Sequence, residues 1–318
     1  FTGLIYFAQE PWHLCVVRFI AALGMGGEWS LGIALVMEVW PEKHRPLMAG
    51  IIGAAANVGF ALIAVFAIFF KVTIDSWRWV ALIGAAPALL TFGFRLFVPE
   101  SEKWQAAVKA SPTKIRPLQE IFGPQLWRTT LIATALTSVA LIGTWGSVQW
   151  LPLWADKMAG AADPSAKGWT GLASGIGAVV GCLAGAWIGG FVRRRTMFFL
   201  LCLGSLVTCA ILFRGFDSYG PAFLTMVFVV GALTASFYGF FPLYLPELFP
   251  TRVRATGQGL SYNAGRILAA AGALQMSALM GMFDGSYAKA GAIITLVYLV
   301  GMVVIWLAPE TKGKPLPE

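Results

Sequence analysis

An arginine stands far inside an apolar stretch near the end of the chain. Arg266 lies midway through residues 256–283, and no acidic residue is found within ten positions of it. A charge at the centre of a bilayer costs roughly 2.5–3.5 kcal/mol on insertion scales, so this guanidinium needs water or a partner. Tyr262, Asn263 and Arg266 share one helical face by their spacing. Such a polar stripe could hold Arg266 against a carboxylate. The alternative is a structural ion pair with an acid such as Glu28.

Glu28 is a carboxylate within the apolar residues 12–40, ten positions after Arg18. A carboxyl group shielded from water holds its proton more readily, which is the property that proton coupling requires. The alternative for Glu28 is a fixed ion pair with Arg18 or with a residue on another helix. We expect Arg18 to be structural or part of a gate rather than to bind a solute.

Aromatic and amide side chains recur in two further apolar stretches. Residues 129–154 contain Trp145, Gln149 and Trp150, and residues 221–246 contain Tyr238 and Tyr244. Rings beside hydrogen-bonding groups are common in pockets for small molecules. Aromatic residues of membrane helices also serve as packing residues or interface anchors, so both roles stay open for each.

A short motif occurs twice, and its spacing organises the chain. Residues 38–45 and 247–254 both read Glu, any residue, aromatic, Pro, three residues, Arg, with an offset of 209 positions. The pair Val98-Pro99-Glu100-Ser101 and Ala308-Pro309-Glu310-Thr311 recurs at nearly the same offset, 210 positions. Two matches in one register indicate a long internal duplication, in which each unit holds several apolar helices.

The composition is that of a membrane protein. The chain is 58% hydrophobic and 12% charged, with a mean hydropathy of +0.74, and soluble domains carry about twice that charge. The four cysteines lie inside apolar stretches, which argues against a disulfide framework or a metal site. The net charge of +8 comes from short loops between helices, so it indicates membrane topology rather than nucleic-acid binding. No pattern of enzyme chemistry or of a bound cofactor is visible.

A helix needs about 20 apolar residues to cross a bilayer, and the predicted spans follow from that length. Residues 1–98 form a partial N-terminal unit, 99–128 a connector, 129–308 a unit of six spans and 309–318 a tail. The repeat offset places the start of the first unit roughly 80 residues before Phe1, so we expect about two and a half helices to precede the chain. The expected spans are 12–40, 47–70, 79–98, 129–154, 169–192, 197–213, 221–246, 256–283 and 290–307.

Positive charge predicts the orientation of these spans. The segments on the side of residues 38–45 and of the C-terminus hold 15 Lys and Arg, and the opposite loops hold 6. Because cytoplasmic loops are enriched in Lys and Arg, we expect the duplicated motif and the C-terminus to be cytoplasmic. An even number of spans separates the two copies, so the units are parallel repeats.

The motifs resemble the major facilitator superfamily, within it the sugar-porter and metabolite:proton symporter branches. The resemblance rests on Arg18 followed by Gly24-Met25-Gly26-Gly27, on the two duplicated loops, and on the Pro-Glu-Ser and Pro-Glu-Thr-Lys-Gly endings. Residues 185–195 are similar to a further loop of the family, although an acid is usual where Gly189 or Gly190 stands. Residues 26–29, 249–259 and 263–266 look like those of sialic acid and related organic-anion symporters.

This resemblance implies an all-α polytopic membrane protein, with the major facilitator fold of two six-helix bundles and the first bundle incomplete. It implies a latch of ion pairs at the cytoplasmic ends, in which Glu247 and Arg254 pair with Arg193 or Arg194. Glu38 and Arg45 would pair with a partner outside the chain. The alternative is that these residues belong to solvated loops.

The implied activity is secondary active transport by alternating access, not enzymatic catalysis. We expect proton-coupled uptake of an organic anion or acidic sugar at a bacterial inner membrane, with no cofactor and no metal. Gln149 is all that remains of the Gln-rich motif of sugar porters, which favours an anion over a hexose. The alternatives are a neutral sugar transporter, either a proton symporter or facilitative, and then an efflux antiporter.

Overall fold

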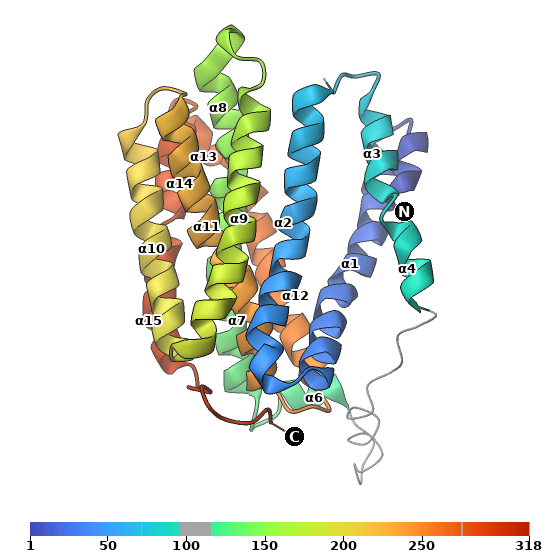
Figure 1. The fold of residues 1–318 in the computed structure, drawn as a ribbon, viewed down its shortest axis with the longest axis vertical. Helices are drawn as coiled ribbons and strands as arrows, with labels where there is room; N and C mark the ends of the chain where they lie inside the picture. Colours follow the sequence, from blue (N-terminus) through green and yellow to red (C-terminus); the bar gives the residue numbers. More distant parts are fainter. Residues whose placement is uncertain (71, 96–115, 275, 318) are drawn as a thin grey trace.

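The computed structural model describes residues 1–70, 72–95, 116–274 and 276–317, and these residues form an elongated bundle of helices (Figure 1). Seven helical segments of the described residues are long and apolar enough to cross a membrane, and no strand occurs among them. The protein is therefore all-α and polytopic. The Pro-Glu-Ser ending at residues 99–101 and most of the connector lie outside the described residues.

The N-terminal part supplies two long helices and a broken one. A short 3₁₀ helix, η1 (Gly3–Phe7), precedes α1 (Pro11–Val39), and α2 follows at Arg45–Phe69. Both long helices lie within two residues of the predicted spans. The span expected at 79–98 is interrupted, because α3 (Trp77–Ala85) ends before Pro87 and α4 (Ala88–Arg95) begins after it. Proline has no N–H for the helical ladder, which explains the break.

The C-terminal part contains the remaining helices. The expected span 256–283 contains α12 and α13, which lie on either side of residue 275, outside the described residues, and the expected span 290–307 contains most of α14 together with α15 and η6. In chain order the elements are α6 (Pro117–Ile121), α7 (Trp127–Gly146), η3 (Val148–Trp150), α8 (Leu151–Ala159), η4 (Gly160–Ala162), α9 (Ala166–Phe191), α10 (Arg194–Gly215), α11 (Pro221–Tyr244), η5 (Leu245–Leu248), α12 (Arg254–Leu274), α13 (Met276–Met282), α14 (Tyr287–Ile294), α15 (Val297–Val304) and η6 (Ile305–Leu307).

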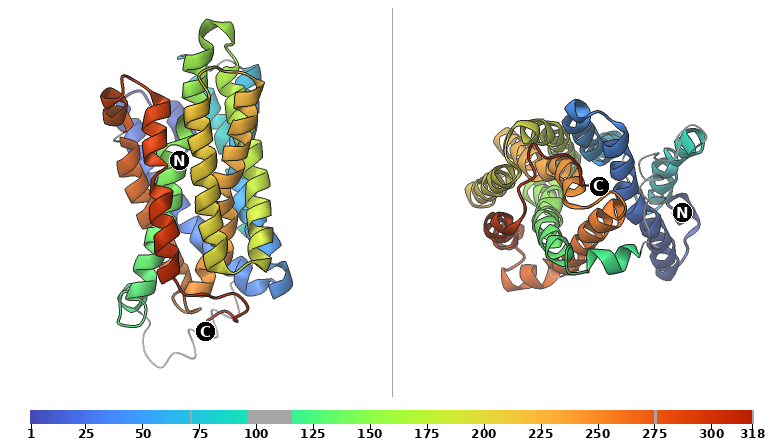
Figure 2. Two further views of the ribbon diagram at one scale, coloured as in Figure 1. Left: turned by 90° about the vertical axis from the view of Figure 1, so that its left-hand side faces the viewer. Right: turned by 90° about the horizontal axis from the view of Figure 1, so that it is seen from below.

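Small residues bring α2, α9 and α11 together, so that the N-terminal part contacts the C-terminal part along much of α2 (Figures 1 and 2). A Cβ atom at Gly53 would lie 2.3 Å from the Tyr238 carbonyl oxygen, and one at Gly239 would lie 1.9 Å from that of Cys182. Helices in lipid associate through such close approach, because apolar side chains gain little from leaving the hydrocarbon. Glycine is thus required at these contacts.

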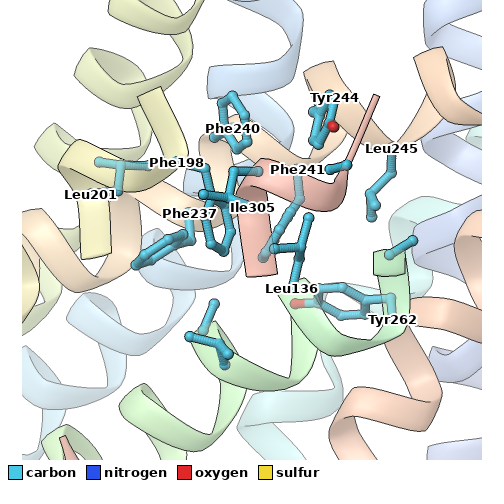
Figure 3. Close-up of a cluster of buried hydrophobic side chains, with 14 of the residues drawn as sticks. Leu136, Phe198, Leu201, Phe237, Phe240, Phe241, Tyr244, Leu245, Tyr262 and Ile305 are labelled. Carbon is cyan, nitrogen blue, oxygen red and sulfur yellow. The ribbon is translucent and has the colours of Figure 1, made fainter. Parts of the chain in front are cut away.

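Aromatic side chains fill the core of the C-terminal part (Figure 3). The Phe237 ring stacks on Tyr298 with centroids 5.9 Å apart, and Phe198 meets Phe237 edge to face. These rings come from α10, α11 and α15, and they are buried. The core fixes the inner helices α7, α11 and α12, which carry Trp145, Tyr238 and Arg266 of the predicted site residues.

The C-terminal segment lies at one end of the bundle, the lower end in Figure 1, together with the turn between α1 and α2. We call this end the tail end. Residues 308–317 run across it and contact α9, α10, α11 and α12 there. Tyr244 donates a hydrogen bond to the Pro309 carbonyl at 2.7 Å, and Arg254 donates one to the Pro317 carbonyl at 2.8 Å.

Candidate functional site

A cavity of about 320 Å³ lies between the helices of the two parts. Its lining comes from α1, α2, α7, α9, α11 and α12, with residues of η3 and α8. Helices from the N-terminal and the C-terminal part thus share one cavity. Its aromatic and polar lining residues are Trp29, Asn57, Phe60, Thr144, Trp145, Gln149, Ser174, Thr234, Tyr238, Tyr262 and Arg266.

Arg266 is the only charged side chain among the described residues that line this cavity. Its guanidinium carbon lies 4.9 Å from the centroid of the Tyr262 ring, and its Nη1 donates to Asn263 Oδ1 at 3.3 Å. The ion pair between Arg266 and Glu28 that the sequence left open is not formed within the described residues. A cation–π contact stabilises Arg266 in place while leaving its charge without a counter-ion.

Trp29 and Tyr262 join the two parts beneath the cavity. Their rings stack with centroids 3.9 Å apart and an interplanar angle of 17°. One turn toward the tail end, Gln258 Nε2 donates to the Ser30 carbonyl at 2.6 Å. The contacts place α1 of the N-terminal part directly against α12 of the C-terminal part.

Of the predicted site residues, Trp145, Gln149, Tyr238 and Arg266 line the cavity. Asn263 lies beside it instead, where its Nδ2 donates to the Gly26 carbonyl at 3.0 Å and so bridges α12 and α1. The amide therefore holds the helices together rather than facing the cavity.

Trp150 and Tyr244 do not line the cavity. Trp150 belongs to η3, and its indole nitrogen is buried away from hydrogen-bond partners within the described residues. Tyr244 is fully buried at the last turn of α11, and its hydroxyl donates a hydrogen bond to the Pro309 carbonyl. A helical stripe of aromatics thus continues beyond the cavity into the core, as the packing interpretation allowed.

Arg18 and Glu28 are exposed on α1 and do not line the cavity. The ion pair between them that the sequence left open is absent from the described residues. The reason is geometric, because ten helical residues span about 15 Å, too far for two side chains to meet easily. The face of α1 that meets α12 carries Trp29 and Ser30 instead.

Glu38 and Arg254 form a buried ion pair at the tail end. Arg254 Nη1 lies 2.9 Å from Glu38 Oε1, and the two side chains are 1% and 4% exposed. The guanidinium also donates to the Pro246 carbonyl at 3.2 Å and to Thr251 Oγ1 at 3.0 Å. The prediction that Glu38 finds its partner outside the chain is wrong, since its partner is the arginine of the second motif copy.

A second ion pair at the same end follows the sequence interpretation. Arg194 donates through Nε and Nη2 to the two carboxylate oxygens of Glu247, at 2.8 and 2.6 Å. Thr311 of the tail donates to the same carboxylate at 2.6 Å. Arg193 is exposed, and Arg45 pairs with the nearby Glu42 at 3.0 Å. The two motif copies therefore use their glutamates and arginines differently.

These features, with a cavity and a buried ion pair shared between the N-terminal and C-terminal parts, agree with the comparison of the chain with known families. The Major Facilitator Superfamily matches residues 1–273. The chain belongs to this superfamily. Its relatives are transporters rather than enzymes, and the protein is accordingly a transporter of the multi-pass membrane type.

Relatives and a solved structure agree with this assignment. A protein described as a metabolite transport protein of Haemophilus influenzae is 31% identical, over 99% of this chain and 78% of its own length. A 4-methylmuconolactone transporter of Cupriavidus pinatubonensis is 27% identical, over 98% and 73%. The sialic acid transporter NanX of Escherichia coli is 25% identical, over 98% and 75%. The crystal structure of the D-xylose-proton symporter superposes with a TM-score of 0.62 at 18% identity, over 89% of this chain and 68% of that one; it shows the major facilitator fold.

Among the lining residues of this transporter that the sequence did not single out are Trp29 and Asn57. Trp29 stacks on Tyr262 between the two parts, and Asn57 lies on α2. The signal for Asn57 was present, because it is the one polar side chain within residues 47–70. A lone amide in an apolar span is costly unless it is hydrogen-bonded. Asn57 donates to the Gly53 carbonyl at 3.2 Å.

The tail of the transporter also caps a helix. Glu310 accepts hydrogen bonds from the backbone N–H groups of Arg194 at 2.9 Å and Arg195 at 3.2 Å, which begin α10. Burial raises the pKa of Glu310, but these N–H groups and that of Lys312 outweigh it, so the pKa is lowered from its ordinary value. Glu310 is therefore held as a carboxylate at a helix N-terminus, where negative charge is favoured.

Proposed function

We propose that this transporter carries a small organic anion into a bacterial cell together with protons, across the inner membrane and with the tail end in the cytoplasm. The observation that carries the proposal is Arg266, the only charged side chain among the described lining residues. A guanidinium binds a carboxylate through two parallel hydrogen bonds, and its attraction grows where water is excluded. The solute carboxylate would supply the counter-ion that Arg266 lacks.

The names of the relatives support an anion. The sialic acid transporter and the 4-methylmuconolactone transporter are named for solutes other than neutral hexoses. The likeness to the D-xylose-proton symporter concerns the fold alone. A neutral sugar, moved with protons or passively, is the second candidate, and Trp145 with Gln149 in the lining is the observation that favours it. An efflux antiporter is the third.

Glu28 is our candidate for the proton carrier. It is the described carboxylate that stands well inside a long helix, since the other described acids lie near helix ends or between helices. A carboxyl group in a membrane span is costly when charged, and such residues are functional by default. Protonation would make Glu28 neutral while the transporter changes from one state to the other.

The tail-end ion pairs would form the cytoplasmic gate. Glu38 on α1 and Arg254 beside α12 bridge the two parts, and alternating access rocks two such parts around a central site. With this pair formed, the parts are held together at the tail end. The pair would separate each time the cavity opens to the cytoplasm. Arg194 with Glu247 lies within the C-terminal part and would stiffen that half of the gate.

Uptake into proteoliposomes with an imposed pH gradient tests the proposal. We expect accumulation of an organic anion that collapses when the gradient is removed, and loss of anion uptake in the variant Arg266→Gln. Arg214→Gln is the matched control, because Arg214 is exposed in the last turn of α10. Uptake of a neutral sugar that is unaffected by Arg266→Gln would favour the second candidate instead. Solute loss driven by an opposite gradient would favour an antiporter.

A further inference from the structure

We infer that the anion is a small planar carboxylate, aromatic or conjugated, and not a polyhydroxylated sugar acid. This inference rests on the proposed function, because it takes Arg266 as the group that binds the carboxylate. It adds which kind of anion the other lining residues of the cavity would select. The observation behind it is that one cation is surrounded by rings and small apolar side chains, with few hydrogen-bond donors left over.

The aromatic lining comes from several helices at once. Trp29 on α1, Phe60 on α2, Trp145 on α7, Tyr238 on α11 and Tyr262 on α12 all face the cavity. Rings that surround a site offer offset-stacked or edge-to-face contacts to a flat ligand, and each such contact contributes beyond the burial of area. A puckered, hydroxylated ring offers fewer such contacts.

Three of the polar lining residues already use their hydrogens within the protein. Thr144 donates its hydroxyl to the Ala140 carbonyl at 2.9 Å, and Thr234 donates to the Val230 carbonyl at 2.7 Å. The Asn57 amide group donates its two hydrogens to the Gly53 carbonyl at 3.2 Å and to Cys182 Sγ at 3.4 Å. These three residues can still accept a hydrogen bond, but they cannot donate another without breaking an existing one.

No carboxylate is found among the described lining residues. A sugar acid carries several hydroxyl groups, each a donor that needs an acceptor once it leaves water. A hydroxyl buried without a partner loses binding free energy, which is why sites that bind polyols require many matched polar groups. The cavity offers one strong donor group, Arg266, and this matches one carboxylate.

Tyr238 adds a second candidate donor. The residue lines the cavity, and its hydroxyl lies beside Thr144 without a hydrogen bond of normal geometry within the described residues. A buried hydroxyl without a partner calls for an explanation, and a ligand that accepts its hydrogen would provide one. The volume of about 320 Å³ is near the small end of ligand pockets, which span roughly 300–1,000 Å³.

A matched pair of acids tests the shape of the site. Benzoate and cyclohexanecarboxylate share a carboxylate on a six-membered ring, but only benzoate is planar. We expect benzoate to bind about three- to ten-fold more tightly, as expected from aromatic contacts of this size. Glucuronate is expected to bind at least about ten-fold more weakly than benzoate, because its several hydroxyl groups leave water for a largely aromatic lining whose acceptors are few and uncharged. Tryptophan fluorescence of the protein in liposomes reports binding, since Trp29 and Trp145 line the cavity.

Variants connect this preference to the rings. Trp145→Leu should lower the ratio of the two affinities toward one, and its exposure of 49% means that little folding energy is lost. Trp187→Leu is the control, because Trp187 is 64% exposed on α9 and does not line the cavity. A ratio near one in the unmodified protein, or glucuronate binding as tightly as benzoate, would overturn the inference and leave anion transport standing. Binding of no acid at all, with binding of a neutral sugar, would overturn the proposed function itself.

Discussion

Arg254 and Glu38 belong to the two copies of one motif, and they pair with each other across the molecule. The arginine of the second copy lies 2.9 Å from the glutamate of the first, with both side chains buried. The two motif copies thus form one contact between the N-terminal and C-terminal parts and not two copies of one local contact. Breaking a buried pair by removing one partner leaves an uncompensated charge and costs about 3–5 kcal/mol.

We accordingly predict that Arg254→Gln lowers the stability of the transporter and shifts it away from the state closed at the tail end. Thermal unfolding in detergent should detect the loss, and a thiol reagent added from the cytoplasmic side should report wider access to a cysteine placed at Ser30. Glu42→Gln serves as control, since its pair with Arg45 is exposed on the glutamate side and is worth about 0–1 kcal/mol.

The double variant Glu38→Arg with Arg254→Glu separates pairing from other roles of Arg254. Restored stability would show that the attraction between the two charges is what matters. If the double variant is no more stable than Arg254→Gln, the contacts of the guanidinium with Pro246 and Pro317 carry the effect instead.

The contacts of Glu310 in the tail lead us to predict that the stability of the protein depends on pH. The pKa of Glu310 is lowered in the folded protein, mainly by backbone N–H groups at the start of α10 that outweigh its burial. Its stabilising contribution is therefore fully present above the ordinary pKa near 4.5 and is lost as the pH falls through the lower folded value. Unfolding measured between neutral and acidic pH should show a decline that Glu310→Gln reduces. That variant should also cost about 1 kcal/mol at neutral pH, as loss of a helix cap does.

The close helix contacts among α2, α9 and α11 lead to a further prediction. Gly239→Ala would place a Cβ 1.9 Å from the Cys182 carbonyl oxygen, a backbone atom that cannot yield cheaply. We expect a loss of at least about 1–3 kcal/mol from overpacking, together with slower transport because α9 and α11 can no longer approach so closely. Gly272→Ala on α12 is the control, since its added Cβ meets nothing within 4 Å. Equal effects of the two substitutions would contradict the claim that this close helix contact requires glycine.

The sequence predicted most helices because a membrane span is set by length and hydropathy, both of which are local properties. Residues 11–39 and 45–69 form helices as expected. The break at Pro87 was also a local signal, but the apolar run concealed it.

The site was less predictable, because hydropathy says that a residue is in a span but not which neighbour it faces. Arg266 was found because its charge is costly anywhere in a span, and it does line the cavity. Glu28 has the same local signal yet lies on the exposed face of α1. Trp29, one position further, was missed, since a tryptophan is ordinary in such a sequence and only the packing of α1 on α12 gives it a partner.

The last prediction concerns Glu28 and the coupling of protons to transport. If Glu28 carries the proton, Glu28→Gln fixes the neutral form, so that solute exchange across the membrane continues while uptake driven by a pH gradient stops. Both rates are measured in the same proteoliposomes, by counterflow of labelled solute and by imposing an acidic exterior. Glu120→Gln is the control, because Glu120 lies outside the long helices and pairs with Arg252. Gradient-driven uptake that persists in Glu28→Gln would remove this residue from the coupling mechanism, and loss of both rates would assign it a structural or solute-binding role.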